Sequence, residues 1–185
     1  LDCRGVNKRF RDPPPLALAA GSTWSQLEVP SGEHLYVAQS DIRDYFFSLE
    51  LPPDLQHLFC LPPISMQYLR DWGIAMPGDG LVDSSGWVWP RCRVIPMGWS
   101  WAMYIAQRVH QNVCLEASSL DTSRLLVEGR PAPDLSEGEV VLIPYADNLN
   151  VAGTDQQRVQ QVKEEIVARL RHHGFRVHEE TEATT

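Results

Sequence analysis

Two aspartates stand where hydrophobic strands are expected to end. Asp41 lies at the end of an apolar run in SDIRDYFFSLEL, and Asp147 lies between the two apolar runs of VVLIPYADNLNVAG. An Asp at a strand end is most often a turn former or a helix cap. Beside buried strands, however, an unpaired carboxylate is costly unless a cation or a donor compensates it. Because two divalent ions about 4 Å apart catalyse phosphoryl transfer, the pair predicts a two-metal site.

A strand and a hairpin are needed to position these aspartates. Residues 35–42 are apolar and β-prone, which predicts a central strand that delivers Asp41 at its C-terminal end. Residues 140–144 and 149–152 predict the two strands of a hairpin around residues 145–148. Both aspartates are therefore expected on the sheet of one domain.

Two helices are expected to accompany this sheet. The first spans residues 98–115, and its apolar positions at helical spacing are Ala102, Ile105, Ala106, Val109 and Val113. The second is capped by Thr154 or Asp155 and ends at Gly174. Its apolar face consists of Val159, Val162, Ile166 and Leu170. A sheet with helices on one face indicates the α+β class.

The remaining segments are less regular. Residues 57–61 and 86–95 predict further extended segments, joined by a loop through residues 73–80 that contains Gly and Pro. Residues 119–138, which include EGRPAPDLSEGE, predict an exposed loop.

Composition sets limits without identifying a function. A chain of 185 residues with 43% hydrophobic content fits one domain with a buried core. No apolar run is long enough to cross a bilayer, and the four scattered cysteines favour reduced thiols over a disulfide framework or a zinc site. We therefore expect a soluble intracellular protein, cytoplasmic or nuclear. The net charge of −8 argues against strong nucleic-acid binding by this segment alone.

Five motifs follow one another in an informative order: LDCRGVNKRF, SDIRDYFFSLEL, IPMGWSWAMYIAQRVHQ, YADN and LRHHGFRVHEE. This order resembles the palm of a retroelement reverse transcriptase, an RNA-directed DNA polymerase. The resemblance implies an α+β polymerase palm, whose antiparallel sheet is covered by helices on one face. It assigns residues 1–34 to a segment linking fingers to palm and residues 35–185 to the palm. The fingers are then truncated and the thumb is absent.

The resemblance also implies a metal site. Asp41, Ile42 and Asp147 correspond to metal-binding positions for Mg²⁺, with Mn²⁺ as the alternative ion. Asp41, Asp147 and Asn148 correspond to the catalytic positions. The family usually has Asp where Asn148 stands, and an amide offers a carbonyl oxygen without a charge. Metal binding is therefore expected to be weaker, and activity is in question.

Nucleotide-binding residues are implied in two motifs. The backbone amides of Asp44 and Tyr45 correspond to contacts with triphosphate oxygens, and Phe46 to the aromatic ring beneath the incoming sugar. A ring there leaves no room and no hydrogen-bond partner for a 2′-hydroxyl, which favours deoxynucleotides. Core packing of the aromatic run is the alternative for Phe46. Met97 and Gly98 lie in the turn expected to approach the nucleotide, and relatives carry Gln or Phe in place of Met97.

Template-binding residues are implied at Arg4, Trp99 and Gln107. Arg4 is expected in a strand leading into the palm, where a solvated terminal strand would explain it equally well. Trp99 and Trp101 offer stacking surfaces, and core packing is the alternative, which we favour for Trp101. An exposed polar helix residue is the alternative for Gln107. The family often has Lys near the C-terminal motif as an acid for the leaving pyrophosphate; His178 is the candidate here, and a surface His is the default.

These features favour a reverse transcriptase fragment that adds deoxynucleotides to a primer 3′-hydroxyl by two-metal phosphoryl transfer. We expect that the parent protein belongs to a retrotransposon. The expected partners of the fragment are an RNA or DNA template-primer, deoxynucleoside triphosphates and the missing fingers and thumb of the parent chain, with no membrane. The rival is a decayed or domesticated palm that binds nucleic acid or protein without catalysis. An RNA-dependent RNA polymerase shares the palm but should have a polar residue in place of Phe46.

Overall fold

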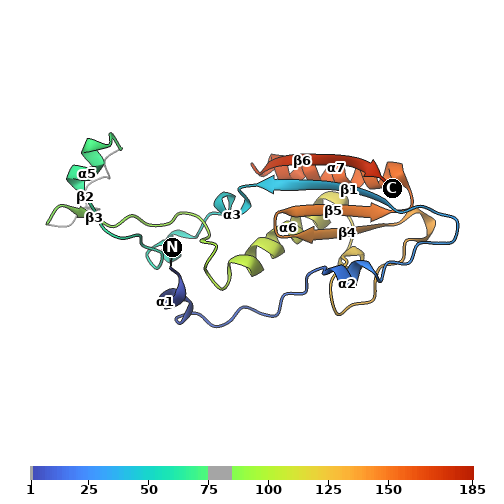
Figure 1. Ribbon diagram of the computed structural model, residues 1–185, viewed down its shortest axis with the longest axis horizontal. Coiled ribbons are helices and arrows are strands. Elements are labelled where there is room, and N and C mark those ends of the chain that lie inside the picture. Colours follow the sequence, from blue (N-terminus) through green and yellow to red (C-terminus); the bar gives the residue numbers. More distant parts are fainter. Residues whose placement is uncertain (1, 75–84) are drawn as a thin grey trace. The chain divides into compact units, whose positions relative to one another are not determined.

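The computed structural model describes residues 2–74 and 85–185, and the chain divides into two compact units (Figure 1). One unit comprises Leu1–Asp12 and Phe46–Ala102, and the other comprises Pro13–Tyr45 and Met103–Thr185. Both aspartates of the predicted site belong to the second unit, which contains the main sheet.

The second unit is built on a four-stranded antiparallel sheet with the order β4-β5-β1-β6. Its strands are β1 (Tyr36–Arg43), β4 (Val140–Tyr145), β5 (Asn148–Gly153) and β6 (Arg176–Thr184). The central strand and the hairpin predicted from the sequence are confirmed, with ends that differ by one residue. Strand β1 pairs with β5 on one side and with β6 on the other, so its backbone is held from both directions.

Alternation along β1 separates two faces of the sheet. Ala38, Ser40 and Ile42 are buried, whereas Gln39 is exposed. Cross-strand partners share a face, and Gln39 lies opposite Asn150 in β5, to which its amide donates over 2.6 Å. The sheet therefore has one buried face and one face with a polar region.

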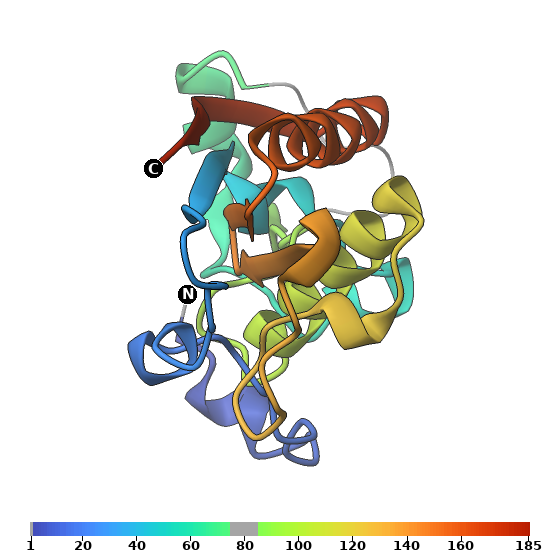
Figure 2. The same ribbon diagram turned by 90° about the vertical axis from the view of Figure 1, so that its right-hand side faces the viewer.

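Helices α6 (Ala102–Ser118) and α7 (Gln156–His172) lie together on one face of the sheet (Figure 2). The second helix follows the sequence prediction closely. The Asp155 side chain accepts from Arg158 N, which caps its first turn, and Gly174 has the left-handed φ of 86° that commonly ends a helix. Its fully buried apolar residues are Val159, Val162, Ile166 and Leu170.

The opposite face is covered at one end by residues of the same unit. There Val141, Ile143 and Ala152 pack with Ala19, Leu126 and Leu135, beside the short helix α2 (Gly21–Trp24). The prediction that residues 119–138 form an exposed loop is therefore wrong in part. The segment is irregular, with short 3₁₀ turns η1 (Thr122–Arg124) and η2 (Ser136–Gly138), but its leucines complete the core. Isolated apolar residues in a polar loop gave no periodicity from which to predict this.

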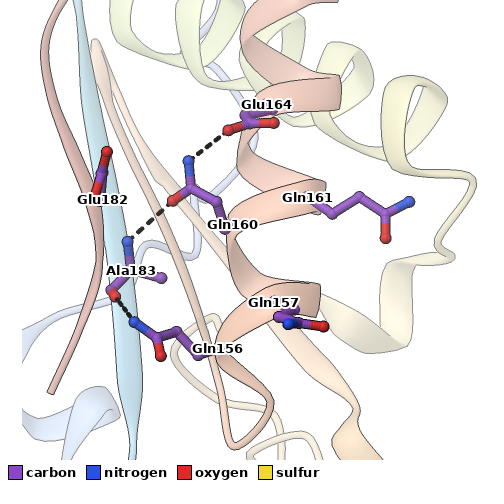
Figure 3. A pocket seen from close by; sticks show the side chains of 7 residues that line it. All are labelled: Gln156, Gln157, Gln160, Gln161, Glu164, Glu182 and Ala183. Carbon is purple, nitrogen blue, oxygen red and sulfur yellow. Dashed lines mark hydrogen bonds between the residues drawn. The ribbon is translucent and has the colours of Figure 1, made fainter.

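Side chains of α7 protect the outer strand of the sheet. Gln156 donates to Ala183 O in β6 over 2.7 Å, and Gln160 accepts from Ala183 N over 3.0 Å (Figure 3). A pocket of about 440 Å³ lies along these glutamines. The amides occupy backbone groups that would otherwise invite pairing with another strand.

The first unit consists of short elements around an aromatic core. They are α1 (Arg4–Asn7), α3 (Tyr45–Ser48, which begins in the second unit), α4 (Pro53–Gln56), β2 (Ile64–Ser65), α5 (Met66–Asp71) and β3 (Trp87–Val88). The ring of Trp99 packs edge-on against Phe10 and Phe59, at centroid distances of 5.2 and 5.3 Å. Strands β2 and β3 form a separate two-stranded sheet.

Three expectations about this part of the chain need correction. Residues 57–61 contain turns and a single bridge at Cys60 rather than a strand, because α4 begins at Pro53, which suits a helix start. Within 86–95, only Trp87–Val88 forms a strand. Helix α6 begins at Ala102 rather than at residue 98, since turns occupy residues 97–101. Of the loop expected at 73–80, residues 75–80 lie outside the described residues.

In the parts of the chain that the structure describes, no helix combines the length and the apolar character needed to cross a membrane.

Candidate active site

Asp41 lies in β1, one of the two central strands of the sheet. Its Cα partners are Asn148 in β5 and His178 in β6. The side chain is 23% exposed, and its Oδ1 lies 2.7 Å from His178 Nε2. A ring nitrogen that carries a proton donates to the carboxylate at this distance. His178 is therefore the immediate neighbour that orients Asp41.

Asp147 lies in the turn between β4 and β5. Its backbone oxygen accepts from Ile42 N over 2.9 Å, and its Oδ1 accepts from Asn148 Nδ2 over 3.0 Å. The turn directly precedes Asn148, which lies opposite Asp41. Two segments that are far apart in the sequence are thus joined through a backbone hydrogen bond, and a shared metal site at the two carboxylates stays a prediction.

The turn has an unusual backbone. Ala146 has φ 51°, in the left-handed region where a Cβ is disfavoured and where Gly, Asn or Asp is common. Ala146 is also buried. The surrounding structure must therefore hold this residue in a conformation that its own side chain does not favour.

Two buried side chains of α6 bind the turn. Gln107 Nε2 donates to Pro144 O over 2.7 Å, and Gln107 Oε1 accepts from Ala146 N over 2.8 Å. His110 Nδ1 lies 2.7 Å from Ala146 O. Because a carbonyl oxygen only accepts, Nδ1 carries the proton in this contact. Burial lowers the pKa of His110 to about 4, so its ring is neutral at pH 7.

The surroundings of Gln107 contradict one of its two interpretations and leave the other a prediction. It is 0% exposed, so the view of it as an exposed polar helix residue is wrong. Both ends of its amide bind backbone, which leaves none of its polar atoms directed to a template. The prediction of template contact therefore gains no support from its surroundings.

The aromatic run after Asp41 has one inward-facing member. Tyr45 is buried, its hydroxyl donates to Ala106 O over 2.8 Å, and burial raises its pKa. Its ring also packs against His110, at a centroid distance of 5.9 Å. Asp44 has φ 54°, and Arg176 donates to its carboxylate over 2.7 Å. Nucleotide contact by the amides of these two residues stays a prediction.

The other predicted nucleotide-binding residues belong to the first unit. Phe46 is partly buried and Met97 is 68% exposed. Gly98 O accepts from Asn7 Nδ2 over 3.1 Å, and Asn7 Oδ1 accepts from Ser100 N over 3.0 Å. Asn7 therefore holds the turn that contains Gly98, a role that no sequence motif indicated.

Two of the predicted template-binding residues, Trp99 and Arg4, make contacts within the first unit. Trp99 is only 5% exposed, so the alternative of core packing is confirmed for it. Trp101, expected in the core, is instead partly exposed and donates from Nε1 to Arg11 O over 2.6 Å. Arg4 lies in the helix α1 rather than in a strand, and it pairs with Asp2 over 2.7 Å. The expectation of a strand at Arg4 was therefore wrong.

The residues at this end of the sheet fit a hard divalent cation. Among the described residues, no three His, Cys, Asp or Glu side chains gather as a complete ligand set. Mg²⁺ commonly binds through one or two carboxylates and takes its other ligands from water and substrate phosphates. Asp41 and Asp147 offer such carboxylates, and Asn148 offers an amide oxygen.

His110 was not predicted because it is a polar residue within the apolar face expected for α6. Of the apolar positions predicted for this helix, Ala102, Ala106 and Val113 are buried as expected, whereas Ile105 and Val109 are only partly buried. The buried side of the helix also includes Gln107 and His110. Gln107 and His110 are three residues apart and therefore share a face of the helix, next to Ala106. This spacing was the sequence signal that could have predicted a buried polar pair.

A comparison with known families gives a match over nearly the whole chain. Residues 3–181 match the family model described as reverse transcriptase (RNA-dependent DNA polymerase). A search of curated proteins found no match. Because the family match spans nearly the whole chain and includes both aspartates, this chain belongs to the reverse transcriptase family.

Proposed function

We propose that this chain carries the catalytic palm of an RNA-directed DNA polymerase, which adds deoxynucleotides to a primer 3′-hydroxyl. The family acts on nucleic-acid template-primers and nucleotides, and nucleotidyl transfer is its chemistry. The observation that carries the proposal is the pairing of Asp41 with Asn148, next to Asp147, at one end of the sheet. Origin in a retrotransposon and the division at residue 34 stay predictions.

Asp41 and Asp147 would hold Mg²⁺, or alternatively Mn²⁺, together with Ile42, which has only backbone oxygen to offer. When bound, two such ions lower the pKa of the attacking hydroxyl and neutralise the charge of the triphosphate and the leaving pyrophosphate. The chain itself fixes the two carboxylates: β1 holds Asp41 through pairing on both sides, and the Ile42 N–H holds the backbone of Asp147.

Asn148 and His178 set the electrostatics around this pair. Asn148 contributes no charge, so the site has one carboxylate fewer than the family usually provides. His178 donates to Asp41 when Nε2 is protonated, which satisfies the carboxylate in the absence of a cation. Cation binding must therefore compete with His178 for Asp41 Oδ1.

Calorimetric titration of the chain with Mg²⁺ tests the proposal. Asp41→Asn and Asp147→Asn should each weaken binding by more than the roughly 10–100-fold typical of residues that only support metal ligands. Glu164→Gln on α7 is a matched carboxylate-to-amide control and should leave affinity unchanged. Equal affinity of all four proteins would contradict the metal site. Primer extension by the same set, with template and deoxynucleotides, then separates a polymerase from a module that only binds cations.

Sugar choice is proposed to depend on Phe46. Replacing Phe46 by Val opens space beneath the sugar and should raise ribonucleotide use relative to deoxynucleotide use in primer extension. Because the ring is partly buried, its loss should also slow both substrates. The ratio of kcat/KM for the two sugars decides the matter. An unchanged ratio would leave Phe46 with a packing role only.

A binding module without catalysis is the second candidate. Asn148 in place of Asp and the net charge of −8 favour it. Template binding measured by fluorescence anisotropy, with no primer extension at saturating Mg²⁺, would support this alternative.

A further inference from the structure

The turn that carries Asp147 is bound from its buried side by helix α6. Gln107 bonds with the backbone on both sides of Tyr145, at Pro144 O and Ala146 N, and His110 bonds with Ala146 O. Both side chains are fully buried. Three hydrogen bonds of 2.7 to 2.8 Å therefore connect one face of α6 to this short stretch of backbone.

Local sequence alone does not favour this turn. A two-residue hairpin turn usually has Gly, Asn or Asp where a left-handed φ is needed, because a Cβ is disfavoured there. Ala146 has no side-chain group with which to stabilise its own conformation, and yet its φ is 51°. Contacts from outside the hairpin must therefore select the conformation, and the bonds to Ala146 N and O act on that residue directly.

We propose that Gln107 and His110 are positioning residues that hold Ala146 in its left-handed conformation and thereby fix where Asp147 leaves the hairpin. Both side chains bond to backbone groups of the turn, so neither is proposed as a ligand of the cation. Control of the turn follows from contacts within the chain, whereas its consequence for cation binding rests on the proposed function.

The geometry of His110 offers a sharp test. Nδ1 contacts the turn, and Nε2 is buried with no hydrogen-bond partner among the residues that the structure describes. An Asn side chain places an amide N–H near the position of Nδ1, whereas the longer Gln places it nearer to Nε2. His110→Asn should therefore retain the bond, and His110→Gln and His110→Leu should lose it.

The first measurement is amide hydrogen exchange at residues 146–148 in the metal-free chain. His110→Leu, His110→Gln and Gln107→Leu should accelerate exchange there by about tenfold, and His110→Asn should stay close to the starting protein. Ser118→Ala is the matched control, because Ser118 is a buried polar residue of α6 whose hydroxyl donates within the helix, to Cys114 O. It should leave exchange at the turn unchanged.

The second measurement is Mg²⁺ affinity by calorimetry. Loss of a residue that supports a metal ligand typically weakens binding by about 10–100-fold. We expect about tenfold weaker binding in the three variants that lose the bond, and recovery in His110→Asn. General damage to the core would affect Asn and Gln variants alike and would not distinguish them.

Several outcomes would overturn the proposal. Unchanged exchange at the turn in Gln107→Leu and His110→Leu would show that the bonds do not hold it. Faster exchange with unchanged Mg²⁺ affinity, in a protein that binds Mg²⁺, would show that Asp147 is not positioned by the turn. If the leucine variants fail to fold, equal behaviour of His110→Asn and His110→Gln would reject it. If the starting protein binds no Mg²⁺, the proposed function fails, and exchange alone decides the control of the turn.

Discussion

The two aspartates at this end of the sheet are held by different means. Asp41 lies inside β1, whose backbone is paired with β5 and β6. Asp147 lies in a turn next to Ala146, whose left-handed backbone is bonded by side chains of α6. The strand position depends on the sheet as a whole, whereas the turn position depends on a few specific hydrogen bonds. Substitutions should therefore disturb the two aspartates separately.

The largest expected effect concerns the strand. Ile42→Ala removes buried methyl groups from β1 and should lower the free energy of unfolding by about 2–5 kcal/mol, as measured by urea denaturation. Because the backbone of Ile42 remains, Mg²⁺ affinity of the folded protein should change little. A large loss of affinity with unchanged stability would contradict the view that the sheet as a whole holds Asp41.

Lowering the pH should destabilise the folded chain through His110, the buried residue that bonds with the turn. His110 has a pKa of about 4 in the folded chain, against 6.5 for an unperturbed His, because burial disfavours its charged form. The unfolded chain therefore binds the proton first. The contribution of neutral His110 to the free energy of unfolding is complete above pH 6.5. As pH falls from 6.5 to 4, the free energy of unfolding should decrease by about 3 kcal/mol.

Urea unfolding across this pH range, compared between the starting protein and His110→Asn, isolates the contribution of His110. The two profiles should converge as pH falls, because Asn does not titrate. Parallel profiles would mean that the His110 ring charges without penalty in the folded chain.

A smaller effect is expected from the turn itself. Ala146→Gly removes the Cβ that disfavours a left-handed φ, which should relieve about 1 kcal/mol, partly offset by the greater freedom of Gly in the unfolded chain. Thermal unfolding should show a small rise in Tm or no change. A clear fall in Tm would indicate that Ala146 is not under backbone strain. Ala152→Gly is the control, because Ala152 lies in strand β5 and has no positive φ. This substitution should lower the Tm.

The smallest effect concerns the departure from the family pattern. Asn148→Asp returns a charged hard ligand beside Asp147 and should tighten Mg²⁺ binding about threefold, as measured by calorimetry. The gain is limited because the new carboxylate also repels Asp41, its cross-strand partner. Equal affinity of the two proteins would argue against a metal role for this position.

Elements with local signals were predictable from the sequence. The α7 helix has a capping Asp155, apolar residues at helical spacing and a terminal Gly174, and each signal acts within a few residues. The same holds for the hairpin, where two apolar runs flank a short polar stretch. The register that places Asn148 opposite Asp41 has no local signal, because it depends on which faces of distant strands are buried together.

The sequence by itself determined which residues are candidates for chemistry: two aspartates beside strands, followed directly after the second by Asn148. Only the tertiary structure decided how they are held. The apolar spacing of α6 correctly placed Ala106 and Val113 on its buried face, but only packing buried the polar Gln107 and His110 as well. Packing also placed Trp99 in an aromatic core. The physical reason is that helical spacing fixes which side chains share a face, while contacts with remote segments choose the face that is buried.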